Sequence, residues 1–176
     1  SYPHLFVPRP KMGFTPKPGE TPKLEYSCEL ICYSSSPAAN QIYTQLQQAA
    51  NTVSMRKFQR GLDGLKNQPI RSLAEKKTPP AEPGFFLSAN TTQKPATVVG
   101  DPPVAVVDPE EMYAGCFVYA NLTPAAYDVD LSRGVKWYLN SVWKVGDGPR
   151  LAPARDAADH YAHLVGKVPM NLAPPV

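Results

Sequence analysis

Aromatic side chains recur at alternate positions in the stretch Met112–Asp128, MYAGCFVYANLTPAAYD, which contains four aromatic residues and neither lysine nor arginine. This period of two is that of a β-strand, which we predict over residues 112–122. One face would carry Tyr113, Gly115, Phe117, Tyr119 and Asn121, and the other Ala114, Cys116, Val118, Ala120 and Leu122. Exposed aromatic rings can stack on nucleic-acid bases, whereas covered rings belong to the core. The stretch alone leaves both interpretations open.

A later segment, GVKWYLNSVWKVGDG at residues 134–148, repeats this mixture and adds lysines. Alternation along a strand places Lys136, Tyr138 and Asn140 opposite Val135, Trp137 and Leu139, with a bulge expected near Ser141. Trp137 is therefore expected in the core. Lysine ammonium groups beside exposed rings would suit a single-stranded nucleic acid, because they can bind phosphates while the rings stack on bases.

The chain offers little metal-binding chemistry. Cys28 and Cys32 lie four residues apart on one predicted strand face, about 13 Å from each other, so they cannot share a tetrahedral zinc ion. Another group of ligand-type residues falls on a predicted C-terminal helix: Asp156, Asp159, His160 and His163. We interpret that group as an exposed helical face, because no constellation elsewhere supplies further ligands.

Catalytic motifs are also lacking. The GDG at residues 146–148 is followed by Pro149, which predicts a hairpin turn and not a phosphate cradle at the start of a helix. No nucleophile elbow, phosphate-binding loop or paired-carboxylate motif is found. We therefore expect a protein that is not an enzyme and that holds neither a cofactor nor a metal.

Length and composition predict one folded domain. The 176 residues are 43% hydrophobic and 19% charged, which is ordinary for a globular protein, and the 21 prolines predict long irregular connections. No apolar window is long enough to cross a membrane, and no secretory leader is recognised, so we expect a cytosolic chain without a membrane segment. The three cysteines are expected to be free thiols.

Charge is distributed unevenly although the net charge is only +3. Lysine and arginine cluster in residues 9–23, 56–77 and 133–155, whereas residues 95–132 contain none and carry six acidic side chains. Any one such cluster is ordinarily a solvated face. Three clusters with aromatic residues between them weaken this interpretation without excluding it, and the net charge alone does not identify a polyanionic partner.

The remaining segments predict the elements that would position these residues. We expect an edge strand at HLFV (4–7), a half-buried strand at 23–33, a helix beginning at Ser36-Pro37 and ending at Gly61, and two short strands within 84–92 and 96–107. A turn at DPEE precedes the strand at 112–122, and a short helix is expected at 155–165. Together they predict a mainly β fold with minor α content: a small, mostly antiparallel barrel with one long helix, a short C-terminal helix and long proline-rich loops.

The order of four segments resembles that of bacteriophage single-stranded DNA-binding proteins that were long classed as a domain of unknown function. The segments are SANTTQKPATVVG, DPEEMYAGCFVYANLTPAAYD, RGVKWYLNSVWKVGDGPRL and ARDAADHYAHL. The specific signatures are Lys94-Pro95 before a Val-Val pair, Tyr113-Ala114-Gly115-Cys116 before an aromatic residue and Val118, the Tyr127-Asp128 turn, Gly134-Val135, Leu139-Asn140, Val142 and Asp147-Gly148. The similarity is strong over residues 85–165 and extends to the first half only in layout.

The resemblance implies an OB-type barrel that coats single-stranded DNA during phage replication and recombination, without catalysis, in the cytoplasm of the infected bacterial host. Duplex DNA as a weaker ligand, phage replication proteins as partners, and a monomeric or weakly dimeric state are further expectations. Residues 1–166 would form the DNA-binding domain and residues 167–176 a flexible tail.

Within that framework, the candidate site residues are those that flank the same predicted strands and loops. Stacking on bases is assigned to Phe117, Tyr119, Tyr138 and Trp143. Phosphate contacts are assigned to Arg9, Lys94, Arg133, Lys136, Lys144 and Arg150.

Two other classes of protein remain open from the residues themselves. A protein-binding module of a replication complex would capture its partner independently of salt and would show no preference for single strands. A small enzyme would need a pocket of perturbed titratable groups, for which the sequence offers only Asp159, His160 and His163.

Overall fold

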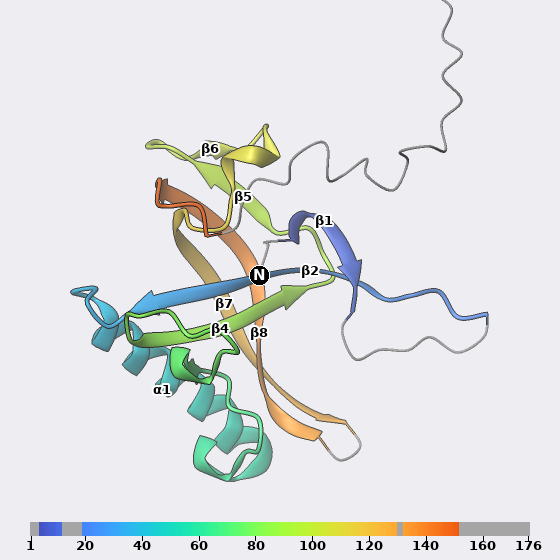
Figure 1. Cartoon of the computed structure of the whole chain (residues 1–176). Coiled ribbons are helices and arrows are strands. Elements are labelled where there is room, and N and C mark those ends of the chain that lie inside the picture. Colours follow the sequence, from blue (N-terminus) through green and yellow to red (C-terminus); the bar gives the residue numbers. More distant parts are fainter. Residues whose placement is uncertain (1–3, 12–18, 130–131, 152–176) are drawn as a thin grey trace, which may run out of the picture.

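One strongly curved sheet and one long helix make up the computed structural model, which describes residues 4–11, 19–129 and 132–151 (Figure 1). The strands are β1 (His4–Pro10), β2 (Leu24–Tyr33), β3 (Arg71–Ser72), β4 (Gly84–Thr91), β5 (Ala96–Val99), β6 (Val104–Ala105), β7 (Phe117–Val129) and β8 (Ser132–Gly146). The helix is α1 (Ala39–Phe58), and the three short 3-10 turns are η1 (Leu62–Gly64), η2 (Leu73–Glu75) and η3 (Pro109–Glu111). The mainly β prediction is confirmed.

The β7–β8 hairpin organises the sheet. The strand order is β1-β2-β4-β8-β5-β6, with β3 beside β4 and β7 beside β8. One edge of β8 pairs with β7 along its length, and its other edge pairs in parallel first with β4 and then with β5. All other pairings between strands are antiparallel. Among the described strands no pairing joins β1 to β6 or β7, so the sheet is a curled half-barrel and not a closed one.

The core lies on the inner face of β8. Trp137 is 2% exposed, and its indole Nε1 donates to the carbonyl oxygen of Pro69 at 2.9 Å. It is packed in one cluster with Leu139 and Val142 of β8, Ala89 of β4 and Ala50 of α1. The predicted burial of Trp137 is therefore confirmed. Burial also raises the pKa of the Cys28 thiol on β2 to about 12, so this side chain is an uncharged apolar group at neutral pH.

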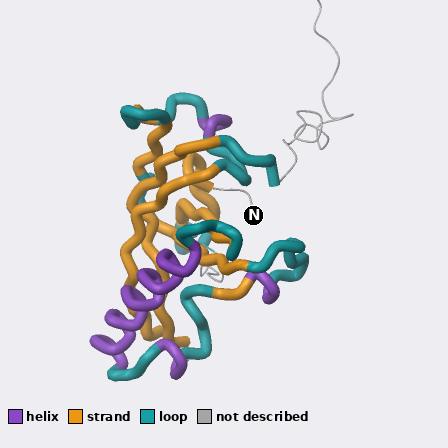
Figure 2. The backbone as a smooth tube through the Cα atoms, turned by 90° about the vertical axis from the view of Figure 1, so that its left-hand side faces the viewer, coloured by secondary structure: helices purple, strands orange, loops and turns teal. Residues whose placement is uncertain are grey.

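Helix α1 packs mainly against β7, at the end of the sheet away from the β5–β6 hairpin (Figures 1 and 2). The predicted helix exists, but its ends differ. Ser36 closes the preceding turn through its backbone, which accepts from Ala39 N at 2.9 Å, and no side chain caps the first helical turn. The helix ends at Phe58, and its C-cap residue Gln59 takes the left-handed conformation at φ 54°, two residues before Gly61.

Strand β7 begins and ends later than the predicted strand at 112–122. Gly115 interrupts the extended backbone at φ +114°, a conformation that favours glycine, and a Cβ there would lie 1.9 Å from the carbonyl oxygen of Pro149. At the other end β7 continues to Val129, through a predicted loop. Among the described strands β7 pairs with β8 alone, so it is an edge strand, where Pro124 is tolerated.

Two predicted turns are wrong. Tyr127-Asp128 lies within β7, where the Tyr127 ring packs over Gly134 so closely that a Cβ would be 2.6 Å from its hydroxyl oxygen. The GDG at 146–148 makes no hairpin, because the chain continues to Leu151, whose N–H donates to the carbonyl oxygen of Ala114 at 2.8 Å. The segment from Gly148 to Leu151 therefore lies against residues 113–115, and the expected turn does not form.

Several other predictions have definite outcomes. The edge strand at 4–7 and the DPEE turn are confirmed as part of β1 and as η3, while the segment 96–107 forms the β5–β6 hairpin and not one strand. Along β2, Glu25 and Ser27 are buried as well as Cys28, so the expected alternation of exposure does not hold there.

The predicted helix at 155–165, its Asp and His group, and the tail at 167–176 lie outside the described residues. Within the described part of the chain, no helix has the length and apolar character needed to span a membrane.

Candidate functional site

The outer face of the β7–β8 hairpin gathers all four predicted stacking residues. We call this the hairpin face and define it by Phe117, Tyr119, Asn121 and Thr123 of β7 with Lys136, Tyr138, Asn140, Ser141 and Trp143 of β8. Its β7 half extends over about 20 Å at the usual rise per residue. Phe117 and Tyr119 are 59% and 68% exposed, so they are not core residues.

A bulge in β8 brings Trp143 onto this face. Asn121 pairs with Ser141 and the next residue, Leu122, pairs with Leu139, so Asn140 is an extra residue in β8. Before the bulge the even-numbered residues of β8 face outward, and after it the odd-numbered ones do. Trp143 therefore lies opposite Tyr119, with ring centroids 5.9 Å apart and planes inclined at 52°. The bulge expected near Ser141 is confirmed.

The rings on the hairpin face are held by identifiable contacts. Trp143 donates its Nε1–H to the carbonyl oxygen of Gly100 at 2.9 Å, which fixes the indole against the β5–β6 turn. Lys136 places its Nζ 4.5 Å from the centroid of the Tyr138 ring, a cation–π distance. An open aromatic surface with an ammonium group beside it results.

Polar side chains separate the Tyr119–Trp143 pair from Tyr138. Asn140 Nδ2 donates to Asn121 Oδ1 and to Thr123 Oγ1, both at 2.9 Å. Asn121 and Asn140 are both exposed. Asn121 and Asn140 were placed on the aromatic strand faces by their spacing, whereas Thr123 lay beyond the predicted strand, and sequence reasoning gave none of the three a role at the site. Two features of the sequence could have indicated a role: the strand faces that Asn121 and Asn140 share with the aromatic residues, and the expected bulge, which aligns Asn140 with Asn121.

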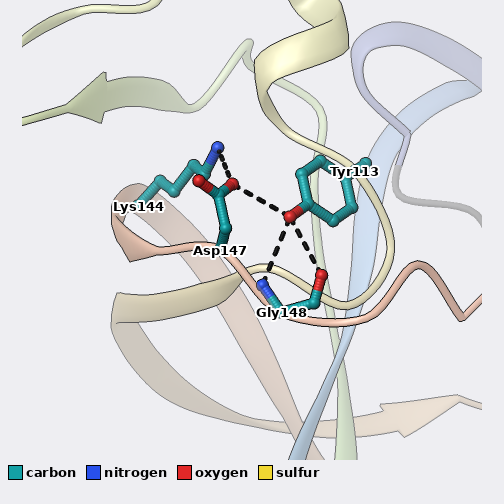
Figure 3. Close-up of polar contacts among 4 residues, drawn as sticks. All are labelled: Tyr113, Lys144, Asp147 and Gly148. Carbon is teal, nitrogen blue, oxygen red and sulfur yellow. Dashed lines mark hydrogen bonds and ion pairs between the residues drawn. The ribbon is translucent and has the colours of Figure 1, made fainter.

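Polar contacts among Tyr113, Lys144, Asp147 and Gly148 hold the Phe117 end of the hairpin in place (Figure 3). The Tyr113 hydroxyl lies 2.9 Å from Asp147 Oδ1 and 3.0 Å from the carbonyl oxygen of Gly148, and it accepts from Gly148 N at 3.2 Å. Lys144 Nζ lies 2.7 Å from Asp147 Oδ1. Gly148 in turn supports the aromatic surface, because a Cβ there would lie 3.3 Å from the Phe117 ring.

The charges of this cluster stabilise each other. The hydrogen bond from Lys144, followed by that from Tyr113, holds the pKa of the Asp147 carboxyl below its ordinary value of 3.8. The same hydrogen bond raises the pKa of Lys144 above its ordinary value of 10.5. The ion pair therefore persists over the whole pH range between these two ordinary values.

Replacing Asp147 with asparagine is expected to lower the melting temperature at neutral pH. The carboxylate's contribution is fully present above the pKa it has in the unfolded chain and is lost as the pH falls through its lowered folded pKa. The difference in melting temperature between the two proteins should thus be constant from pH 7 to about 5 and shrink below the ordinary carboxyl value. Thermal unfolding of both proteins across this range measures it. An equal difference at pH 7 and at pH 2.5 would show that the charge of Asp147 is not responsible.

The remaining predicted phosphate-binding residues lie in different places. Lys144 faces inward after the bulge and is committed to Asp147, with an 11% exposed side chain. Arg150 lies 4.2 Å from the centroid of the Tyr113 ring, at the Phe117 end of the hairpin face, and Arg133 pairs with Asp128 at 3.0 Å at the opposite end of the hairpin.

Arg9 and Lys94 lie on other elements, Arg9 on β1 and Lys94 in the segment between β4 and β5. Lys94 Nζ is 5.6 Å from the centroid of the Phe6 ring, and Arg9 on β1 lies opposite Glu25 of β2. In the parts of the chain that the structure describes, no hydrogen bond, ion pair or ring contact connects either residue with the hairpin face. The structure therefore brings together Phe117, Tyr119, Tyr138, Trp143 and Lys136, with Arg150 and Arg133 at the two ends.

A curved β-sheet that presents exposed aromatic rings beside cationic groups is typical of proteins that bind single-stranded nucleic acid. The particular family is given by comparison with known proteins. A family model described as the ssDNA-binding protein of Enterobacter phage Enc34 matches residues 1–169, and the chain belongs to this family. The resemblance inferred from the sequence motifs is thereby confirmed.

Solved structures of phage proteins share the fold. The single-stranded DNA-binding protein from bacteriophage Enc34 is 21% identical, with a TM-score of 0.64 over 92% of this chain and 84% of that one. The same protein in complex with ssDNA is 22% identical, with a TM-score of 0.63 over 86% and 84%. The single-stranded DNA-binding protein gp2.5 of bacteriophage T7 is 12% identical, with a TM-score of 0.50 over 89% and 88%. Comparison with curated proteins gives no significant match.

Proposed function

We propose that this chain binds single-stranded DNA on its hairpin face, largely independently of sequence, and coats it during phage DNA replication and recombination. The observation that carries this proposal is the set of four aromatic side chains on one sheet face, of which Phe117 and Tyr119 are more than half exposed. Every base has a π face, so such rings bind bases without reading their identity. The family membership of the chain supports the same function.

The sheet is, in this proposal, an OB-type barrel whose β7–β8 hairpin forms the binding surface. The parallel pairings of β8 with β4 and with β5 within a curled sheet whose other strand pairings are antiparallel support this, as does the structural similarity to the phage proteins. The protein acts without catalysis in the cytoplasm of the infected host, where the replicating DNA is found. Duplex DNA binds more weakly, because its bases are already stacked on each other.

The phosphate contacts fall on the cations around the hairpin face. Lys136 lies on the face itself, and Arg150 and Arg133 lie at its ends, so a strand following the hairpin passes all three. Arg9 on β1 and Lys94 between β4 and β5 would contact phosphates from outside the hairpin. Lys144 contributes less than these, because Asp147 already neutralises its charge.

A titration of intrinsic tryptophan fluorescence with poly-dT and with a matched duplex, at low and moderate salt, tests the proposal. Of the two tryptophans, Trp143 lies on the hairpin face and Trp137 is buried, so a base that stacks on the face should quench Trp143. We expect strong quenching by the single strand, weaker quenching by the duplex, and a decrease with salt. If the folded protein binds neither DNA at low salt, a partner-binding module becomes the better interpretation.

Replacing Lys136 with glutamate is expected to weaken binding by a similar factor for all base compositions. The ammonium group beside Tyr138 would contact a phosphate, which carries no sequence information. The slope of log affinity against log salt concentration should become shallower by about 0.7, the value for one phosphate contact with a single strand. Affinities for dT, dA and dC oligonucleotides at four salt concentrations measure this.

The matched control is Lys77, an exposed lysine that follows η2. Lys77→Glu changes the net charge equally but not the hairpin face, so it should alter the slope less. Equal slopes for the two variants would indicate that overall charge, and not Lys136, determines the salt dependence.

A further inference from the structure

The side-chain amides of Asn121 and Asn140 lie between the Tyr119–Trp143 pair and Tyr138 on the hairpin face, and each has one polar atom that is not used in a hydrogen bond to a described residue. Asn140 Nδ2 uses its two N–H groups on Asn121 Oδ1 and Thr123 Oγ1. Asn140 Oδ1 and Asn121 Nδ2 form no hydrogen bond with any described residue, and both side chains are exposed. One acceptor and one donor are therefore presented side by side, and their orientation is fixed by the bonds on their other atoms.

This donor–acceptor pair lies where a base would be seated. On one side of it along the hairpin are the rings of Tyr119 and Trp143, and on the other is Tyr138, which lies opposite Thr123. A strand whose bases stack on both aromatic positions must pass over the two asparagines. A base in this passage can turn its edge toward the amides.

We propose that Asn121 and Asn140 bind the Watson–Crick edge of one unpaired base, and that this contact helps the protein select single strands over duplex DNA. The proposal rests on the function proposed above. Each of the four bases carries both donors and acceptors on its Watson–Crick edge, so the pair of amides accepts any base. A base in a duplex has that edge occupied by its complement and cannot make the contact.

A thymine homopolymer methylated at N3 tests the contact, because the methyl group removes the N3–H donor and leaves the ring face and the phosphates unchanged. Binding is measured for this strand, for unmodified dT of equal length and for a duplex. We expect the wild-type protein to bind the methylated strand about 2- to 12-fold more weakly than dT, the loss of one net hydrogen bond. The double variant Asn121→Ala/Asn140→Ala should bind both strands with equal affinity, and its affinity for the duplex should match that of the wild type.

The matched control is Asn40→Ala, which removes an exposed asparagine from the first turn of α1 and should retain the wild-type preference for dT. Equal binding of dT and methylated dT by the wild-type protein would overturn the proposal. So would a double variant that weakens binding to dT, methylated dT and duplex by the same factor, since the asparagines would then only shape the hairpin. A wild-type protein that binds none of the three would instead contradict the proposed function.

Discussion

Replacing Tyr119 with alanine is expected to lower the affinity for poly-dT by about 5- to 150-fold, or about 1 to 3 kcal/mol, which is the usual contribution of one ring that stacks on a base. Tyr119 is 68% exposed and lies against Trp143. The substitution therefore removes one ring of the Tyr119–Trp143 pair and buries no additional group. Fluorescence anisotropy of a labelled oligonucleotide at fixed salt measures the affinity.

Tyr43 provides the control for this experiment. It is another tyrosine with an exposed ring, but it lies on α1 and packs edge-on against Phe85, away from the hairpin face. Tyr43→Ala should leave the affinity for poly-dT within about twofold, a difference of less than about 0.5 kcal/mol. If Tyr119→Ala binds poly-dT as tightly as the wild-type protein and unfolds at the same temperature, the Tyr119–Trp143 pair is not a stacking surface.

Replacing Trp137 with alanine is expected to lower the free energy of unfolding by about 3 to 5 kcal/mol, the cost of removing a large buried aromatic side chain. The substitution leaves a cavity beside Leu139 and Val142, and it leaves the Pro69 carbonyl oxygen without the indole N–H. Urea unfolding followed by circular dichroism measures the change. If the alanine variant does not fold, Trp137→Phe should fold with a smaller loss of stability.

Trp143→Ala is the matched variant on the opposite face of β8. Trp143 is partly exposed, so its loss should destabilise the chain much less than that of Trp137, while it should weaken binding to poly-dT. The two tryptophans thus separate stability from binding. Similar losses of stability in both variants would contradict the assignment of the two faces of β8.

The alternation of side chains in two segments was enough to predict the faces of the hairpin strands. Strict alternation put Trp137 inward, and it put Phe117 and Tyr119 on the opposite face from Ala120; the structure confirms both. This works because the side-chain period of a strand is fixed by its backbone geometry and does not depend on what the strand packs against. The start of β7 was not predictable in the same way, since it depends on the close approach of Gly115 to Pro149, which is distant from it in the sequence. Its end depends on the register of β7 against β8, in which Tyr127 pairs with Gly134.

Sequence motifs therefore determined the family, the mainly β fold and the presence of aromatic residues on one face of each of two strands, with a lysine beside them on the second. Tertiary structure decided which of these residues meet. One extra residue in β8 reverses its alternation, turning Trp143 outward to Tyr119 and Lys144 inward to Asp147. A pattern of types and spacings cannot fix the position of such a bulge to one residue, because it depends on the register of β7 against β8 over their whole length. That register is also what aligns Asn140 with Asn121, the contact on which the proposed recognition of an unpaired base depends.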